Sequence, residues 1–400
     1  MNLRDKLRAI GGPDSGKETK KKPETGPGDC RRFTVYRPAE ELPGASEVRR
    51  ETLEMMSNVS LPEDFDPRNI LYLDTETTGL GGSGTVAFLV GLGYLTDSGF
   101  EVHQFLMRDY DEERYLLRHV EEELNRFGTV CTFNGTTFDL PLLESRLLMN
   151  RFRRDCLDKP HIDLLHIARR LWRKRLTQCS LGRLEAMILG KPREDDLPGS
   201  EVPQRYFTYL KTGREELLDD ILTHNAQDIV SLCVLLTHMS RMYEHPESIR
   251  YSEDVYSMGR ALERFSHPDE ARKCYRLARR GRAGDEAGLA LAQSWRREGN
   301  REEAAVVWRE MIGARRGGAA PYIEMAKYLE HVRKDPAGAL EMTDRAIALL
   351  SETALKPDIT VQETQNALQY RRQRLKRKLA AMSEKKESQT DGTGNDVQGQ

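Results

Sequence analysis

The stretch Ile70-Leu-Tyr-Leu-Asp-Thr-Glu-Thr77 begins with four apolar residues and ends with two acids that are separated by one residue. A short apolar run of this kind, bounded by polar residues, is typical of a buried strand. Residues i and i+2 of a strand point to the same side, so the carboxylates of Asp74 and Glu76 leave the sheet on one face. Because two acids at the end of an apolar strand need a partner or solvent, this segment is the first candidate for a functional site.

The residues around this strand predict an α/β domain over residues 68–242. Further strands are expected at 87–95, 101–106 and 129–135, and helices at 111–126, 164–175, 181–189 and 215–239, where apolar residues recur at spacings of three and four. A further helix is expected to begin at Asp139, with Pro141 in its first turn. The pattern predicts a mixed five-stranded sheet flanked by helices.

A repeat is visible beyond residue 250. Ala271, Tyr275 and Ala278 are followed 33 residues later by Ala304, Trp308 and Met311, and a looser third copy holds Ala339 and Ala346. A period near 34 with small and aromatic residues at these offsets resembles the tetratricopeptide helix pair. We therefore expect an all-α domain of tetratricopeptide-like helical repeats over residues 250–380.

Composition limits the class of protein. The 62 basic and 64 acidic residues give a net charge of −2, so charge alone argues neither for nor against nucleic acid. The six cysteines form no CxxC pair and lie mostly in apolar patterns, which favours reduced thiols and a cytoplasmic protein. No apolar run approaches 18 residues, so no membrane partner is expected.

The ends of the chain differ in composition from the rest. Residues 1–30 and 381–400 are rich in Gly, Pro, Lys, Glu and Ser, and we expect them to be disordered tails. Residues 31–67 are interpreted as a segment that leads into the first domain.

Two more acids occur in contexts that would direct them to the same point as Asp74 and Glu76. Asp139 closes the sequence Asn-Gly-Thr-Thr-Phe-Asp, and Asp228 follows His224 by one turn of the predicted helix 215–239. Several carboxylates together suit two Mg²⁺ or Mn²⁺ ions, which are hard cations that prefer oxygen ligands. Such a pair of ions activates water and stabilises the leaving oxygen in phosphodiester hydrolysis.

These three segments resemble the three motifs of the ribonuclease H-like DEDD 3′→5′ exonuclease superfamily, in a bacterial branch with C-terminal tetratricopeptide-like repeats. The resemblance covers roughly residues 68–240. It implies that Asp74, Glu76, Asp139 and Asp228 bind the metal ions and are catalytic, and that His224 is the catalytic general base. The resemblance also implies contacts with substrate from a larger set of residues, namely Thr75, Thr77, Gly79, Leu80, Asn134, Phe138 and Asp163.

One spacing departs from the family pattern. In the subgroup that uses histidine, this residue stands five positions before the last Asp, and in the subgroup that uses tyrosine it stands four before. Here His224 precedes Asp228 by four positions. A shift of one residue turns a helical side chain by about 100°, so the sequence leaves the role of His224 open.

Other interpretations compete for some of these residues. Asp139 stands where an N-cap would serve the helix that follows. Gly79-Leu-Gly-Gly-Ser-Gly84 satisfies a dinucleotide-binding GxGxxG pattern, but the next residues predict a strand in place of the required helix. The arginines and lysine among residues 169–175, and the arginines of 151–154, are either solvated helix faces or contacts to a phosphate backbone.

Taken together, the sequence predicts a metal-dependent 3′→5′ exonuclease that acts on single-stranded ends of DNA or RNA. One alternative is a nucleic-acid-binding scaffold whose helical repeats recruit a protein partner. Another is a structure-specific endonuclease with the same metals. The sequence does not discriminate between DNA and RNA, because that choice depends on how a pocket treats the 2′-hydroxyl.

Overall fold

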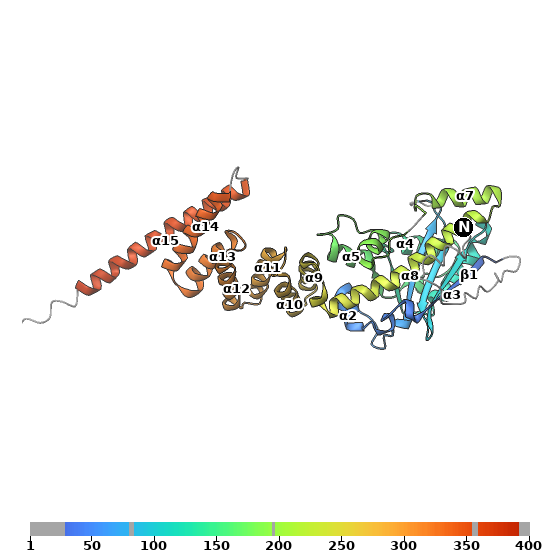
Figure 1. Cartoon of the computed structure of the whole chain (residues 1–400), viewed down its shortest axis with the longest axis horizontal. Helices are drawn as coiled ribbons and strands as arrows, with labels where there is room; N and C mark the ends of the chain where they lie inside the picture. The colour runs from blue at the N-terminus through green and yellow to red at the C-terminus, as the bar shows by residue number, and fades with distance from the viewer. Residues whose placement is uncertain (1–28, 80–83, 194–196, 354–358, 392–400) are drawn as a thin grey trace, which may run out of the picture. The chain divides into compact units, whose positions relative to one another are not determined.

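The computed structural model describes residues 29–79, 84–193, 197–353 and 359–391. Leu80, one of the predicted substrate contacts, lies outside these ranges. The chain divides into two compact units, Met1–Ile249 and Arg250–Gln400 (Figure 1). Among the described helices, none has both the length and the apolar character that crossing a membrane requires.

The first unit is built on one mixed sheet with the strand order β1-β4-β3-β2-β5-β6. Strands β2, β5 and β6 run parallel to one another, and the pairs β1/β4, β4/β3 and β3/β2 are antiparallel. The strands are β1 (Arg31–Pro38), β2 (Ile70–Thr77), β3 (Ala87–Leu95), β4 (Gly99–Leu106), β5 (Thr129–Thr132) and β6 (His161–Asp163). All nine residues of β3 are buried, as expected for a strand that is covered on both faces.

The prediction of five strands was wrong by one. Strand β1 lies in the segment 31–67 that the sequence analysis interpreted only as a lead-in, and it pairs along its whole length with β4 at the edge of the sheet. Its residues, RRFTVYRP, alternate between partly buried and exposed positions, so no apolar run marks it. At the opposite edge, β6 is only three residues long, which is too short for a periodic pattern.

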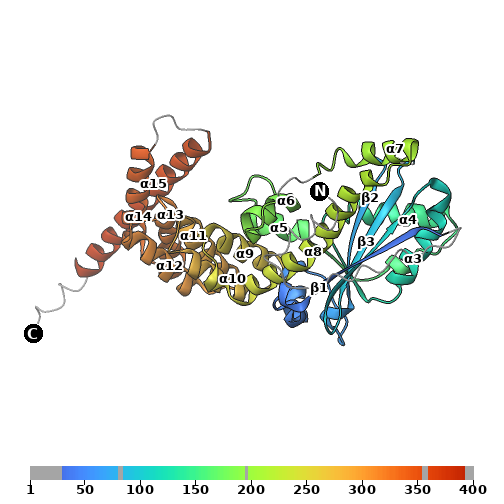
Figure 2. The same ribbon diagram turned by 45° about the vertical axis from the view of Figure 1, so that its right-hand side comes forward.

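Helices flank this sheet. They are α2 (Arg50–Ser57), α3 (Glu113–Leu124), α4 (Asp139–Met149), α5 (Leu164–Trp172), α6 (Leu181–Leu184), α7 (Val202–Thr212) and α8 (Glu216–Glu244), and a π-helical turn, η6 (Glu185–Leu189), continues α6. Helix α8 packs against β2, β3 and β4, and α3 packs against β3 and β4. Figure 2 shows α8 along one face of the sheet and α3 on the other.

Two glycines on β3 allow α8 to lie directly on the sheet. A Cβ atom added to Gly93 would come within 2.3 Å of Cγ2 of Ile229, and one added to Gly91 within 2.2 Å of Oδ1 of Asn225. Tyr94, next along the strand, points to the opposite face, where its ring lies 5.0 Å from that of Phe127. Because these two glycines have no side chains, α8 can approach β3 closely.

The second unit is a series of helices, and each packs against the next along the chain. They are α9 (Ser252–Arg264), α10 (Pro268–Ala278), α11 (Gly284–Arg297), α12 (Arg301–Gly313), α13 (Ala320–Tyr328), the π-helical η8 (Leu329–Arg333), α14 (Pro336–Thr353) and α15 (Ile359–Asp391). The residues that repeat in the sequence lie in α10, α12 and α14, and all of them are buried. Helix α15 continues to Asp391, beyond residue 381 where the sequence predicted the start of a tail.

Candidate functional site

Hydrogen bonds connect the three acidic segments across β2. The hydroxyl of Thr75 on β2 donates to Oδ1 of Asp139, the first residue of α4, over 2.6 Å. Nδ2 of Asn225 on α8 donates to Oδ2 of Asp74 over 2.9 Å. The end of β2, the start of α4 and the middle of α8 therefore meet at one place.

The side chain of Asn225 is itself fixed from β4. Nε2 of Gln104 donates to Oδ1 of Asn225 over 2.9 Å and to the backbone oxygen of Leu222 over 2.8 Å. Both amides are almost fully buried, with exposed fractions of 1% for Gln104 and 0% for Asn225. Because the amide oxygen of Asn225 accepts from Gln104, its NH₂ group faces Asp74. Sequence analysis missed both residues.

The four acids act on one another electrostatically. Burial raises the pKa of Asp74 well above its ordinary value, and the neighbouring charges of Asp228, Asp139 and Glu76 raise it further. Burial also raises the pKa of Glu76 to about 8 and that of Asp139 to about 6, although the Thr75 hydroxyl opposes the second shift. The pKa of Asp228 is raised by burial against the lowering effect of His224 and Arg193. Such a cluster of mutually repelling carboxylates is typical of sites that bind cations.

His224 lies beside these acids despite its unusual spacing. Its Nε2 is 3.6 Å from Oδ2 of Asp228, and both side chains are 14% exposed. The histidine also lowers the pKa of Glu76 on the neighbouring strand. A spacing of four residues on α8 thus brings the imidazole to the acidic cluster.

A buried guanidinium, that of Arg193, is part of the same site. Its side chain is 7% exposed, and it pairs with both Glu185 and Asp228. One of its NH groups also lies 3.2 Å from Nδ1 of His224. Burial lowers the pKa of Arg193, but the hydrogen bonds and charges of Glu185 and Asp228 outweigh this effect and raise it. Arg193 was missed in the sequence because it stands in a loop without periodic pattern.

Asp163 and Asn134 shape the loop between β5 and α4. The carboxylate of Asp163 accepts hydrogen bonds from the backbone N–H groups of Asn134 (2.8 Å), Thr136 (3.1 Å) and Leu165 (3.1 Å). Asn134 has a left-handed backbone with φ of 71°, a conformation that asparagine tolerates better than most residues. Asp163 therefore positions the loop that leads to Asp139, and its direct contact with substrate stays a prediction.

Of the remaining predicted substrate contacts, Phe138 is exposed, and Thr77 and Gly79 are half-buried. Phe138 is 50% exposed and directly precedes Asp139. The hydroxyl of Thr77 donates to the backbone oxygen of Gly79 over 2.7 Å, at the start of the loop after β2. The residues after this loop form β3 and not a helix, as predicted, which excludes the dinucleotide fingerprint. The predicted N-cap role of Asp139 is not observed, because the N-cap residue is Phe138 and no side chain caps α4.

The arginine-rich stretches are partly engaged within the protein. Arg153 pairs with Asp155, and Arg154 pairs with Glu144. Arg170 on α5 donates to the backbone oxygen of Met56 over 3.1 Å. These contacts favour a structural role for the three arginines.

The four carboxylates fit divalent metal ions by their chemistry, because they offer only hard oxygen donors in a partly buried place. Within the described residues, three potential ligand atoms lie within 4.8 Å of one another only at Asp29, Cys30 and His119. There, His119 Nε2 and Asp29 Oδ1 form a 2.9 Å hydrogen bond, and burial raises the pKa of the Cys30 thiol to about 12. The hydrogen bond between Asp29 and His119 explains that cluster as packing of the segment before β1 on α3. In the acidic cluster, by contrast, Asp228 is already paired with Arg193.

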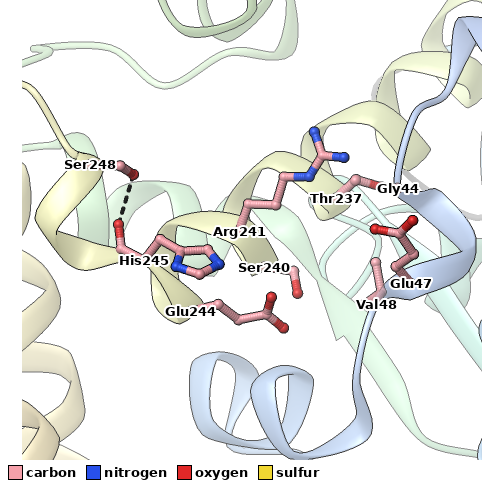
Figure 3. A pocket seen from close by; sticks show the side chains of 9 residues that line it. All are labelled: Gly44, Glu47, Val48, Thr237, Ser240, Arg241, Glu244, His245 and Ser248. Carbon is pink, nitrogen blue, oxygen red and sulfur yellow. Dashed lines mark hydrogen bonds between the residues drawn. The ribbon is translucent and has the colours of Figure 1, made fainter.

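A hollow of about 330 Å³ lies near the C-terminal end of α8 (Figure 3). Thr237, Ser240, Arg241 and Glu244 of the helix line one side of it. These residues follow Asp228 by 9 to 16 positions, which is roughly 13–24 Å along a helix. The hollow is therefore separate from the acidic cluster.

The raised pKa of Glu76 predicts an unusual dependence of stability on pH in the presence of a chelator. With a pKa of about 8, Glu76 retains its proton in the folded protein up to about pH 8, whereas the unfolded chain releases it near the ordinary pKa of 4.5. This group therefore contributes stability below pH 4.5 that is lost as the pH rises through 8. We expect Glu76→Gln to stabilise the protein relative to wild type by roughly 1–3 kcal/mol at pH 8 and by less at pH 5.

Urea unfolding in the chelator at the two pH values measures this difference. The matched control is Asp97→Asn, because Asp97 is 91% exposed and pairs with Arg68 at the surface. The control should show no gain that grows with pH. An equal gain for Glu76→Gln at pH 5 and pH 8 would contradict the expectation.

Comparison with known proteins finds a family model that matches part of the first unit. Residues 71–240 match the family model described as the RNase_H superfamily. The range includes Asp74, Glu76, Asp139 and Asp228, and the match to this superfamily suggests a nuclease-type function and a nucleic acid substrate.

Two individual proteins illustrate the relationship. The chain is 31% identical over 333 residues to the "Uncharacterized protein YprB" of Bacillus subtilis (strain 168), with 82% of this chain and 79% of that protein covered. The chain therefore belongs to the same family as that protein. A family B DNA polymerase from the archaeon Pyrobaculum calidifontis shares 13% sequence identity and has a TM-score of 0.34, over 52% of this chain and 29% of the polymerase chain. The chain thus spans less than a third of that polymerase.

Proposed function

We propose that this protein is a metal-dependent 3′→5′ exonuclease of the DEDD type that acts on single-stranded ends of nucleic acid. The observation that carries the proposal is the meeting of β2, α4 and α8 through the Thr75–Asp139 and Asn225–Asp74 hydrogen bonds. These contacts bring the three acidic segments of the sequence into one cluster within an RNase H-superfamily domain.

Asp74, Glu76, Asp139 and Asp228 are the residues that would hold two Mg²⁺ or Mn²⁺ ions. Bound ions of this kind supply charge that activates water and stabilises the leaving oxygen of a phosphodiester. The raised pKa values of these acids support the assignment, because a cation relieves the repulsion that raises them. Thr75 and Asn225 serve as positioning residues, since each donates to one of the carboxylates.

His224 is proposed as the general base that takes a proton from water. A neutral imidazole suits this role near neutral pH, and the side chain lies beside Asp228. Phe138, half exposed beside Asp139, offers an aromatic face on which a terminal base can stack.

For the second unit we propose tetratricopeptide-like repeats that bind a protein partner. The support comes from the packing of consecutive helices, which gives the pairs α9/α10, α11/α12 and α13/α14, and from the burial of the repeating residues in α10, α12 and α14. About three such pairs are needed for a stable stack.

The test of the nuclease function uses labelled single-stranded oligonucleotides of DNA and of RNA, linear and circularised, with Mg²⁺ or Mn²⁺. An exonuclease degrades the linear strands to nucleoside monophosphates from the 3′ end and leaves the circles intact. We expect Asp228→Asn to reduce this rate by about 10²-fold or more, because the variant removes a proposed ligand.

Two outcomes would contradict the proposal. Cleavage of circular strands at the same rate as linear ones would indicate an endonuclease. No cleavage of any substrate with either metal would leave the scaffold alternative, in which the domain only binds nucleic acid. The control variant is Asp97→Asn, which changes an exposed acid outside the cluster. It should cleave at the wild-type rate.

A further inference from the structure

Arg193 contacts both Asp228, a proposed metal ligand, and His224, the proposed base. The guanidinium pairs with Oδ1 of Asp228, and a second NH group lies 3.2 Å from Nδ1 of His224. It also contacts Glu185, to which one NH₂ donates over 2.7 Å. The arginine thus bridges a proposed metal ligand, the proposed base and a third, buried acid.

The hydrogen-bonding capacity of each group fixes the protonation of the histidine. A guanidinium has only donors, so Nδ1 of His224 must accept in its contact with Arg193. In the neutral imidazole, the proton then resides on Nε2, the atom that lies 3.6 Å from Oδ2 of Asp228. With Nδ1 engaged and Nε2 protonated, the imidazole in this arrangement has no lone pair with which to accept a proton from water.

The same contact opposes metal binding at Asp228. A carboxylate oxygen that accepts a charge-assisted hydrogen bond from arginine must give up that bond to donate its electrons to a cation. A fixed positive charge next to a proposed cation site also repels the cation. Arg193 and a divalent ion therefore compete for Asp228.

Glu185 offers the arginine a place to remain when it leaves Asp228. The Glu185 side chain is 2% exposed and is held by the Ser231 hydroxyl on α8. The guanidinium has two carboxylate partners, Glu185 on η6 and Asp228 on α8, so it can stay paired with Glu185 when it releases Asp228. Buried arginine without any partner would be much less favourable.

We propose that Arg193 is an inhibitory cap on the site: it holds Asp228 and His224 in an inactive arrangement, and divalent metal ions displace it from both. This inference rests on the proposed function, because it takes Asp228 as a metal ligand and His224 as the base. In this role Arg193 competes with the metal ions, so the affinity of the site for metal depends on Arg193, as does the turnover.

The test measures Mn²⁺ binding to the full-length protein by calorimetry and by electron paramagnetic resonance, without substrate. Removal of Arg193 alone would leave Glu185 buried and unpaired, so the main variant is the double change Arg193→Met with Glu185→Met, which replaces a buried pair by apolar side chains. We expect this variant to bind Mn²⁺ about tenfold more tightly or better. Arg205→Gln is the control, because Arg205 pairs with Asp220 on the outer part of α8.

A variant that keeps the charge separates direct capping from a long-range charge effect. Lysine at position 193 retains the positive charge but lacks the fork that reaches three partners at once. A cap predicts that Arg193→Lys binds Mn²⁺ more tightly than wild type, whereas a long-range effect predicts wild-type affinity. Nitrogen NMR of His224 should also show that Mg²⁺ changes the environment of Nδ1 in wild type but only slightly in the double variant.

The outcomes distinguish this inference from the proposed function. If wild type binds Mn²⁺, Asp74→Asn abolishes the binding and the double variant equals wild type, the cap is overturned and the metal site stands. If neither wild type nor the double variant binds Mn²⁺ at millimolar concentration, the metal site and the cap both fail.

Discussion

We expect Asp74→Asn to lose about 10³-fold or more of the rate at which the wild-type protein cleaves a linear oligonucleotide with Mg²⁺ or Mn²⁺. Asp74 interacts electrostatically with the other three acids, because the charges of Asp228, Asp139 and Glu76 add to the effect of burial in raising its pKa. The amide has the same shape and still accepts from Nδ2 of Asn225. The change therefore removes a negative charge and a metal ligand while the hydrogen bond to α8 is retained.

Single-turnover cleavage with a labelled strand measures this loss, and the unfolding midpoint in a chelator excludes a trivial cause. We expect the midpoint of Asp74→Asn to equal or exceed that of wild type, since one of four repelling carboxylates is gone. Asp97→Asn should retain both the rate and the midpoint, because that acid is 91% exposed. A rate for Asp74→Asn within tenfold of wild type would place the chemistry elsewhere in the protein.

The features that could be predicted from sequence are those that depend on local pattern. The apolar run before Asp74 predicted strand β2, and the residues after Gly84 predicted β3, because a buried strand is marked by its own residues. The positions of the acids on a strand end, a helix start and a helix face were also local. Their meeting was expected from these contexts and from the resemblance to a known family.

The features that could not be predicted depend on contacts between distant segments. Arg193 carries no periodic signal, and its importance follows from a pairing with Asp228, which lies on a helix 35 residues later. Gln104 belongs to a strand whose alternation was recognised, yet its partner Asn225 is 121 residues away. Strand β1 has few apolar residues because an edge strand is buried less than a central one.

The approach of α8 to the sheet connects the fold with the site. Gly91 lies under Asn225 and Gly93 under Ile229, so the two glycines set how closely the helix that carries His224 and Asp228 meets β3. In the register of the sheet, Gly91 lies opposite Asp74 and Gly93 opposite Tyr72. Because glycine has no side chain, Gly91 and Gly93 thus determine how far Asp228 of α8 lies from Asp74 and Glu76 of β2.

We expect Gly93→Val to lower the free energy of unfolding of the first unit by about 3 kcal/mol. A Cβ atom at position 93 would lie 2.3 Å from Cγ2 of Ile229 and 2.6 Å from Cζ of Phe100, and valine adds two methyl groups beyond it. Both neighbours are completely buried, so neither can move into solvent. Chemical denaturation monitored by circular dichroism measures the loss, which corresponds to a fall in melting temperature of roughly 6–12 °C.

Gly93→Val should also reduce cleavage at temperatures where the variant is fully folded, because a displaced α8 carries Asp228 and His224 away from Asp74. A shift of about 1 Å at a site of this kind reduces catalysis by about 10²-fold. Gly199→Ala is the control, since a Cβ atom there meets nothing within 4 Å, and it should leave stability and rate unchanged. Loss of stability with a wild-type rate in the folded variant would show that α8 can move without disturbing the acids, and the proposed link between the glycine pair and the site would then be wrong.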